Sequence, residues 1–286
     1  MRKFSRELEL YFELRGTPES SRESYTRRVK AFVHFVEDRG KKAQDTTLQD
    51  IQEYALYLKK ERSLSAGTIN NYISSIRFFY THVLDKEWNK RKVPRMRRVH
   101  KLPVIPPKEA VLTLLDSITN LKHKAILMMI YGSGLRVSEV AKLKISDICS
   151  KTMRVRVDNA KHNTNRYTVL SEAALGVLRQ YFRTYLSGTK YSPGDWLFPG
   201  RVSGKHIHIK TIKNTLLKIR DRLQMDERIS AHTLRHCFAT HSLEAGVEIA
   251  HIREMLGHKN LSTTAGYLHL TSKSMLGVKS PLDVRE

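Results

Sequence analysis

Residues 85–107, DKEWNKRKVPRMRRVHKLPVIPP, constrain the possible folds of this chain more than any other stretch. The segment contains four prolines, three basic clusters and few acidic residues, a composition that predicts an extended linker and argues against a helix. The hydrophobic patterns on its two sides differ. We therefore expect two domains, residues 1–84 and 108–286, joined by a basic linker.

Apolar side chains recur every three to four residues through the first 84 positions. In residues 20–40 they are Tyr25, Val29, Phe32 and Val36, and we expect Ser20 or Ser21 to cap this helix. Residues 46–60 and 65–84 have the same spacing. Together with the opening segment, the pattern predicts a bundle of about four helices.

The pattern becomes mixed from Lys108 onward. MRVRV and RYTVL alternate as two strands around the polar turn DNAKHNTN, which favours a hairpin. Helical periodicity predicts further helices at about 108–119, 122–131, 172–186, 209–223, 231–245, 248–256 and 262–270, with another beginning near LRVSEVAKL. The expected fold class is mainly α with a small β-sheet (α+β).

The charge of the chain points to a polyanionic partner. Lys and Arg number 51 against 28 Asp and Glu, giving a net charge of +23. Such an excess favours nucleic acid as the partner, and the basic linker is expected to lie along its phosphate backbone. Residues 209–223 carry one apolar stripe, and most side chains on the rest of this predicted helix are basic. This pattern is typical either of a helix beside a DNA groove or of a solvated surface helix. The expected DNA-binding residues are Lys210, Lys213, Lys218, Arg222, Arg95, Arg97 and Arg98.

No apolar run approaches the roughly 20 residues of a membrane helix, and the first residues lack the apolar core of a signal peptide. Cys149 and Cys237 form neither a disulfide framework nor a zinc spacing, and we expect both to be packing residues. These features predict a cytoplasmic location and no membrane partner.

The stretch HTLRHCFATH, residues 232–241, places three histidines and one arginine on one short, partly apolar predicted helix. His232 and Arg235 are three residues apart and share a face, as a phosphate-binding site requires. A buried arginine bonded to carbonyl groups is the structural alternative. His232 and His236 also have the spacing of paired zinc ligands, but Thr233 occupies the position where a zinc protease needs glutamate, so we expect no metal.

Five stretches of the second half, GSGLRVSEV, DNAKHNTNRYTVL, HTLRHCFATHSLEAGV, EMLGHKNLSTT and YLHL, occur in the order and approximate spacing of a known family. The chain resembles the tyrosine recombinase (phage integrase) family, particularly its Xer-type members. These motifs span about 130–270. The N-terminal bundle resembles the family's SAM-like core-binding domain, so the resemblance covers nearly the whole chain.

The resemblance implies a DNA strand transferase that works through a covalent 3′-phosphotyrosine. Arg136, Arg235 and His258 would clamp the scissile phosphate, and His232 would assist proton transfer. Lys161, in the hairpin turn, matches the general acid, and Tyr267 matches the nucleophile. Glu139 would orient the neighbouring cations, and a solvated carboxylate is the alternative. We expect His236 and His241 to be structural, packing or bonding behind the active face.

The chemistry of such a site can be argued from its residue types. Attack on a phosphodiester builds negative charge on the nonbridging oxygens, and guanidinium groups can substitute there for metal ions. A tyrosine hydroxyl, with a reference pKa of about 10, needs a nearby base or concentrated positive charge to become a nucleophile. The covalent intermediate retains the bond energy, so rejoining needs no ATP, and we expect no cofactor.

The resemblance also implies an assembly. We expect a C-shaped clamp around duplex DNA and a homotetramer on two paired recombination sites, with a C-terminal tail from about residue 271 that docks on a neighbouring protomer. The host would be bacterial or archaeal, with the protein beside the nucleoid. The ending VKSPLD resembles element-borne integrases. Two alternatives stay open: a type IB topoisomerase that relaxes DNA as a monomer, and a noncatalytic DNA-binding factor.

Overall fold

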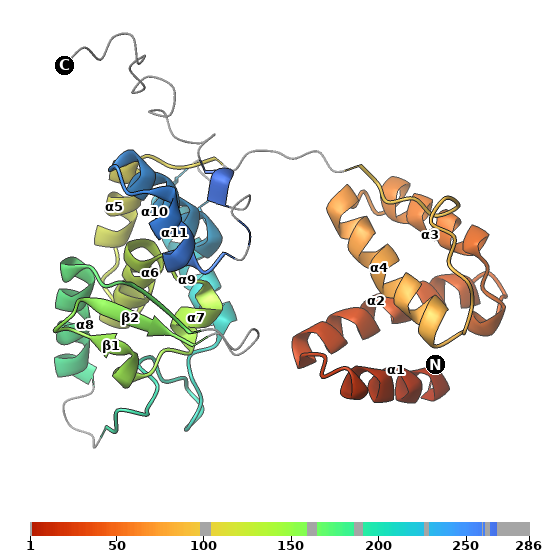
Figure 1. The fold of residues 1–286 in the computed structure, drawn as a ribbon, viewed down its shortest axis with the longest axis horizontal. Helices are drawn as coiled ribbons and strands as arrows, with labels where there is room; N and C mark the ends of the chain where they lie inside the picture. The colour runs from red at the N-terminus through yellow and green to blue at the C-terminus, as the bar shows by residue number, and fades with distance from the viewer. Residues whose placement is uncertain are drawn as a thin grey trace, which may run out of the picture. The chain divides into compact units, whose positions relative to one another are not determined.

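The computed structural model describes residues 2–97, 104–158, 165–185, 191–225, 229–258, 260 and 264–267. The chain divides into two compact units, Met1–Lys101 and Leu102–Glu286. Figure 1 draws the ribbon of both units, and each unit has its own hydrophobic core. Among the described residues, no helix combines the length and the apolar character needed to cross a membrane.

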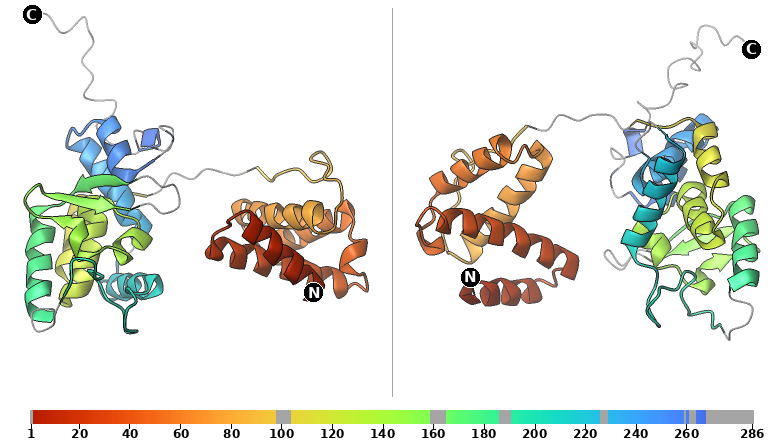
Figure 2. Two further views of the ribbon diagram at one scale, coloured as in Figure 1. Left: turned by 60° about the horizontal axis from the view of Figure 1, so that its bottom comes forward. Right: turned by 180° about the vertical axis from the view of Figure 1, so that it is seen from behind.

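The first unit is a bundle of helices, as the periodicity predicts (Figure 2). Thr47 and Asp50 cap α3 (Leu48–Lys60) reciprocally, and Ser65 caps α4 (Ala66–His82) by accepting a bond from the backbone N–H of Thr68. The second helix begins at Glu19 with Pro18 as its N-cap, so the expectation of a Ser20 or Ser21 cap was wrong. The bounds are α1 Arg2–Leu14, α2 Glu19–Glu37, α3 Leu48–Lys60 and α4 Ala66–His82.

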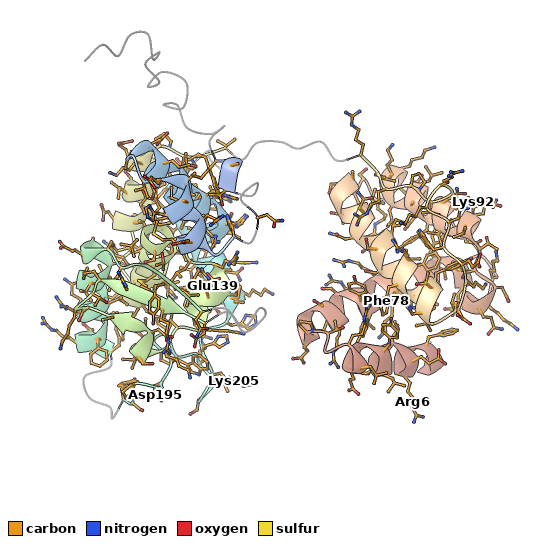
Figure 3. All side chains as sticks on the ribbon, viewed as in Figure 1. Arg6, Phe78, Lys92, Glu139, Asp195 and Lys205 are labelled. Atoms are coloured by element: carbon orange, nitrogen blue, oxygen red, sulfur yellow. The ribbon has the colours of Figure 1, made fainter. Side chains whose placement is uncertain are left out.

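Apolar positions spaced at helical intervals form the core of this unit. Phe32 of α2 is buried in one cluster with Ile51 of α3 and Ile76 of α4, and Val29 is buried in a neighbouring cluster. Phe78, labelled in Figure 3, lies in an aromatic group, with its ring centroid 4.9–5.6 Å from those of Tyr11, Phe12 and Tyr25. The predicted stripe therefore faces the interior.

Residues 85–97, the first part of the expected linker, contain no helix and lie against the helical bundle. Val93 is buried, and Asn70 of α4 exchanges two hydrogen bonds of 2.9 Å with the backbone of Met96. Arg95 donates a bond of 3.2 Å to the hydroxyl of Ser74. This stretch is thus anchored to the first unit through side chains of α4.

The described part of the second unit is mostly helical with a three-stranded antiparallel sheet, in the order β1 (Ile148–Cys149), β2 (Arg154–Val157), β3 (Arg166–Val169). Strand β2 pairs with β3 in antiparallel orientation, as the hairpin pattern predicts, and in this register Val155 lies opposite Thr168. The two-residue strand β1 was not predicted because it is too short to show an alternation. The elements are α5 Lys108–Asp116, α6 Leu121–Ser133, α7 Val137–Ala141, β1 Ile148–Cys149, β2 Arg154–Val157, β3 Arg166–Val169, α8 Glu172–Tyr185, α9 Ile209–Arg222, α10 Ala231–Glu244 and α11 Ile249–Leu256.

Helix α6 is central to the second core. Ala125, Met129 and Ile130 are fully buried, and the helix packs against both α8 and α10 (Figure 1). It ends at Gly134, whose φ of 63° lies in the left-handed region that glycine adopts without strain. This turn directs the next residues, Leu135 and Arg136, into the start of α7.

Candidate active site

Arg136 lies at the N-cap of the short helix α7. Glu139, one turn later, accepts a 2.8 Å bond from the backbone N–H of Arg136 and a 2.7 Å bond from its guanidinium. The side chain of Arg136 nevertheless stays 40% exposed. The guanidinium is therefore fixed at one edge while other N–H groups remain accessible to an anion.

Arg235 of α10 is 1% exposed and is held mainly by backbone carbonyls. It donates to the carbonyl of Gly134 at 2.7 Å and to that of Leu256 at 2.6 Å, and it lies 3.3 Å from Nε2 of His258. Burial and the charge of Arg136 lower the pKa of Arg235 to about 10, so the group is still a cation at neutral pH. Arg235 is thus a buried arginine bonded to carbonyl groups, which was the structural alternative to a phosphate site. The same carbonyl bonds hold its guanidinium next to His258.

Glu139 connects three arginines, of which Arg166 was missed from the sequence. Arg166, the first residue of β3, donates to both carboxylate oxygens of Glu139 at 3.0 and 2.7 Å, and the guanidinium of Arg235 lies 3.5 Å from the same carboxylate. Burial acts to raise the pKa of Glu139, but Arg166 and Arg136 outweigh it and lower that pKa to about 2. The carboxylate is therefore ionised and keeps the guanidiniums close together.

Tyr267 and His236 are joined directly. The hydroxyl of Tyr267 is 2.8 Å from Nδ1 of His236, and the tyrosine is 4% exposed. The ring of His258 is stacked on Tyr267 with centroids 6.2 Å apart, and its Nδ1 lies 3.0 Å from the hydroxyl of Thr264. The ring of His232 packs edge-on against that of His236, with the ring centroids 4.1 Å apart. His232, His258 and Tyr267 thus gather around His236, and Arg235 lies beside His258.

The electrostatics of this cluster favour neutral histidines and a protonated phenol. Burial, reinforced by neighbouring positive charge, lowers the pKa of His236 and of His258 to about 4 each. The same causes lower the pKa of His232. Burial raises the pKa of Tyr267, against the opposing effect of Arg235 and Arg136. The nucleophile candidate is therefore uncharged at neutral pH.

His236 and His241, both expected to be structural, differ in their surroundings. His241 lies further along α10, where its Nδ1 is 3.0 Å from the hydroxyl of Tyr131 in α6. That pair joins two core helices and fits the structural expectation. His236 contacts the hydroxyl of the expected nucleophile, a relationship that helix periodicity alone gave no reason to expect.

The remaining predicted residues lie on other surfaces or outside the described residues. Lys161 and Arg98 fall outside the described ranges. Lys210, Lys213 and Lys218 are exposed on α9, whose apolar stripe is buried. Arg222 is also exposed and donates a 2.7 Å bond to the carbonyl of Ser117. In the first unit, Arg95 and Arg97 are exposed.

The described ranges contain no group of three or more His, Cys, Asp or Glu side chains that could hold a metal ion. Cys149 is exposed and Cys237 is buried in the core of the second unit, and both are free thiols. The histidines of α10 are accompanied by guanidiniums, a set suited to an anion.

Family models match both units of the chain. Residues 107–274 match the phage integrase family, and residues 4–90 match the phage integrase N-terminal SAM-like domain. The integrase/recombinase homologue y4qK of Sinorhizobium fredii is 36% identical over 91% of this chain and 82% of that protein. Tyrosine recombinase XerA of Pyrococcus horikoshii is 30% identical over 94% of this chain and 90% of its own length.

Solved structures share the fold. The crystal structure of XerA recombinase covers the whole chain and 99% of its own, with 24% identity and a TM-score of 0.54. The Tn1549 transposon integrase, solved in complex with a circular intermediate DNA, covers 92% of this chain and 94% of its own, with 19% identity and a TM-score of 0.70. The topoisomerase and noncatalytic alternatives are not favoured, since the relatives are named recombinases. The chain belongs to the phage integrase family and is a tyrosine-type site-specific DNA recombinase.

Proposed function

We propose that Tyr267 attacks the scissile phosphate and forms a 3′-phosphotyrosyl bond, while Arg136, Arg235 and His258 clamp the nonbridging oxygens. The observation that carries this assignment is the close approach of Arg235 to His258, 3.3 Å, with the ring of His258 stacked on Tyr267. Glu139 supports the clamp by binding Arg136 at 2.7 Å. Preorganised cations of this kind stabilise the charge that develops in the transition state.

Proton transfer at the two oxygens completes the proposed reaction. His232 assists it, and Lys161 protonates the leaving 5′ oxygen. The intermediate conserves the phosphodiester bond energy, so a 5′ hydroxyl from another strand reseals the DNA. We propose that neither metal nor ATP takes part, because guanidiniums supply the charge that metals supply in other phosphoryl transfers.

The proposed partner is duplex DNA carrying paired recombination sites. We propose that residues 1–84 form a DNA-binding domain and residues 85–107 a basic strap. With the catalytic domain, 108–286, they would close as a C-shaped clamp. Exposed cations, namely Lys210, Lys213, Lys218, Arg222, Arg95 and Arg97, support this assignment, together with Arg98, which lies outside the described residues.

The proposed assembly is a homotetramer on DNA, a proposal that is compatible with a monomer in solution. The tail from about residue 271 would dock on a neighbouring protomer. We place the protein in a bacterial or archaeal cytoplasm and infer that it moves a genetic element. Deleting residues after 274 should weaken cooperative assembly on paired sites, measured by gel shift; unchanged assembly would remove the tail from the proposal.

The nucleophile is tested with a nicked suicide substrate taken from DNA flanking the gene. The native chain should accumulate a covalent adduct that survives denaturation, and Tyr267→Phe should form none. Tyr131→Phe is a matched control, because it removes another phenol that contacts a histidine of α10, in this case His241. An adduct formed by Tyr267→Phe contradicts the assignment.

The general acid is tested separately. Lys161→Ala should cut normal DNA slowly and should recover when the leaving 5′ oxygen is replaced by sulfur, because a thiolate leaves without protonation. Failure of sulfur to rescue this variant removes Lys161 from the proposed role and leaves the Tyr267 assignment untouched.

A further inference from the structure

The hydroxyl of Tyr267 is held against one particular imidazole. Nδ1 of His236 lies 2.8 Å from that hydroxyl, and the two ring centroids are 5.4 Å apart. The tyrosine also packs in a small apolar cluster with Phe238, Ile252 and Leu256, which restrains its ring. A buried hydroxyl in this setting needs a hydrogen-bond partner, and His236 provides one.

We propose that His236 holds the hydroxyl of Tyr267 before DNA binds and accepts its proton when Tyr267 attacks the phosphate. This inference rests on the proposed role of Tyr267 as the nucleophile. It assigns a catalytic role to a residue whose position on α10 suggested packing. The required tautomer carries its hydrogen on Nε2, which leaves the lone pair of Nδ1 free to accept.

The other two histidines of the cluster are less well placed for this step. His258 has its Nδ1 3.0 Å from the Thr264 hydroxyl and its Nε2 3.3 Å from Arg235, so both ring nitrogens face other groups. His232 lies one turn earlier on α10, with its ring centroid 4.1 Å from that of His236, so its proposed assistance to proton transfer acts through His236. Within the described site, His236 is therefore the imidazole in hydrogen-bond contact with the phenol.

The surrounding charges make this proton transfer depend on substrate. Burial lowers the pKa of His236, and His232 and Arg235 on the same helix lower it further, while Tyr267 and His258 face it from the segment after α11. Tyr131 of α6, with Lys108 and Glu109 of α5, acts instead on His241 further along α10. A phosphate bound to Arg235 offsets the positive charge beside His236 and strengthens His236 as a base.

Bonds and protons balance in this step. The bond between the Tyr267 oxygen and phosphorus forms while the bond from phosphorus to the 5′ oxygen breaks. The phenol proton passes to Nδ1 of His236, and the 5′ oxygen takes a proton from the general acid. In rejoining, a 5′ hydroxyl attacks phosphorus and returns its proton to the general acid. The bond from phosphorus to the Tyr267 oxygen breaks, and that oxygen recovers its proton from His236.

The test compares His236→Gln and His236→Ala with the native chain in single-turnover cleavage of the nicked substrate. Glutamine can accept a hydrogen bond but cannot take the proton, so we expect both variants to cleave about 100-fold more slowly, a typical loss for a general base. Replacing Tyr267 by 3-fluorotyrosine, whose phenol is more acidic, should remove most of this deficit. The native rate should fall at acid pH as His236 becomes protonated, and both variants should lack that fall.

The matched control is His241→Gln, which breaks the other histidine–tyrosine contact of α10 and should cleave at the native rate. The comparison of tyrosine with fluorotyrosine is made within each variant, so a fold defect affects both members equally. Two outcomes overturn the inference. In one, the His236 variants lose the same factor in cleavage rate with tyrosine and with 3-fluorotyrosine at position 267. In the other, His236→Gln cleaves at the native rate. If Tyr267→Phe forms no adduct and His236→Gln cleaves at the native rate, Tyr267 remains the proposed nucleophile. Only the proposed role of His236 is then removed.

Discussion

Arg166 binds both carboxylate oxygens of Glu139, through hydrogen bonds of 3.0 and 2.7 Å. Its Nε donates to the carbonyl of Met255 at 2.8 Å and so connects β3 to the end of α11. Because Glu139 also binds Arg136, one carboxylate sets the positions of the guanidiniums proposed to clamp phosphate. The precision of the clamp therefore depends on Glu139, a residue that we do not expect to contact DNA itself.

Replacing Arg166 by alanine should slow single-turnover cleavage about 100-fold, since small displacements of a positioned group have effects of that size. On a methylphosphonate substrate, which carries less negative charge at the scissile position, the deficit should shrink. Arg154→Ala, on the exposed side of the neighbouring strand β2, is the matched control and should cleave normally. An Arg166 deficit that is the same on both substrates would indicate a general loss of structure instead of a misplaced clamp.

Acid should destabilise the second unit in two separate pH windows. His236 and His258 have folded pKa values of about 4, below the usual 6.5, so the unfolded chain binds more protons between those values. Their contribution is complete above pH 6.5 and is lost as the pH falls toward 4. Glu139, with a pKa of about 2, contributes fully above 4.5 and loses its contribution below that value. Urea unfolding measured at a series of pH values checks both windows.

Two variants separate these windows. His236→Gln should reduce the pH dependence of the free energy of unfolding between pH 6.5 and 4, leaving the part that His258 contributes, and should not change the lower window. Glu139→Gln should flatten only the part below 4.5. A variant that changes the other window would show that the assignment of the titrating groups is wrong.

Gly134→Ala should cost about 3 kcal/mol of stability, because alanine is strained in the left-handed backbone conformation and its Cβ overpacks the neighbouring side chains. Its φ is +63°, and an added Cβ would clash with the ring of Phe238 and lie 2.9 Å from Cδ2 of Leu256. Gly204→Ala is the control, because its φ is +72° with nothing within 4 Å. The control should cost about 1 kcal/mol, from backbone strain alone. Thermal unfolding measures both, and equal losses of stability would contradict the packing argument.

The exposed lysines of α9 should contribute to DNA affinity through phosphate charge. Lys213→Ala should weaken binding to all sequences alike and reduce the slope of log K against log salt by about 0.9, the value for one phosphate that is no longer neutralised. Arg222→Ala should change the slope less, because Arg222 already donates to the carbonyl of Ser117. Fluorescence anisotropy at several salt concentrations measures this, and an unchanged slope for Lys213→Ala would place α9 away from DNA.

The amino-acid sequence determined the local structure and the reactive side chains of this protein. Helical periodicity predicted the four-helix bundle and the stripes that become its core, since that signal repeats every turn and needs no distant partner. Strand β1 was not predicted because two residues carry no period. The motifs also identified Arg136, Arg235, His258 and Tyr267 as candidates.

Only the tertiary structure decided which of these side chains meet. Arg166 is 27 residues from Glu139, and His236 is 31 residues from Tyr267, yet both pairs are in hydrogen-bond contact. Such contacts depend on how α7, α10, α11 and β3 pack and on the turn at Gly134. Periodicity reports which face of an element is buried, whereas the partner across that face is set by the packing of the whole unit.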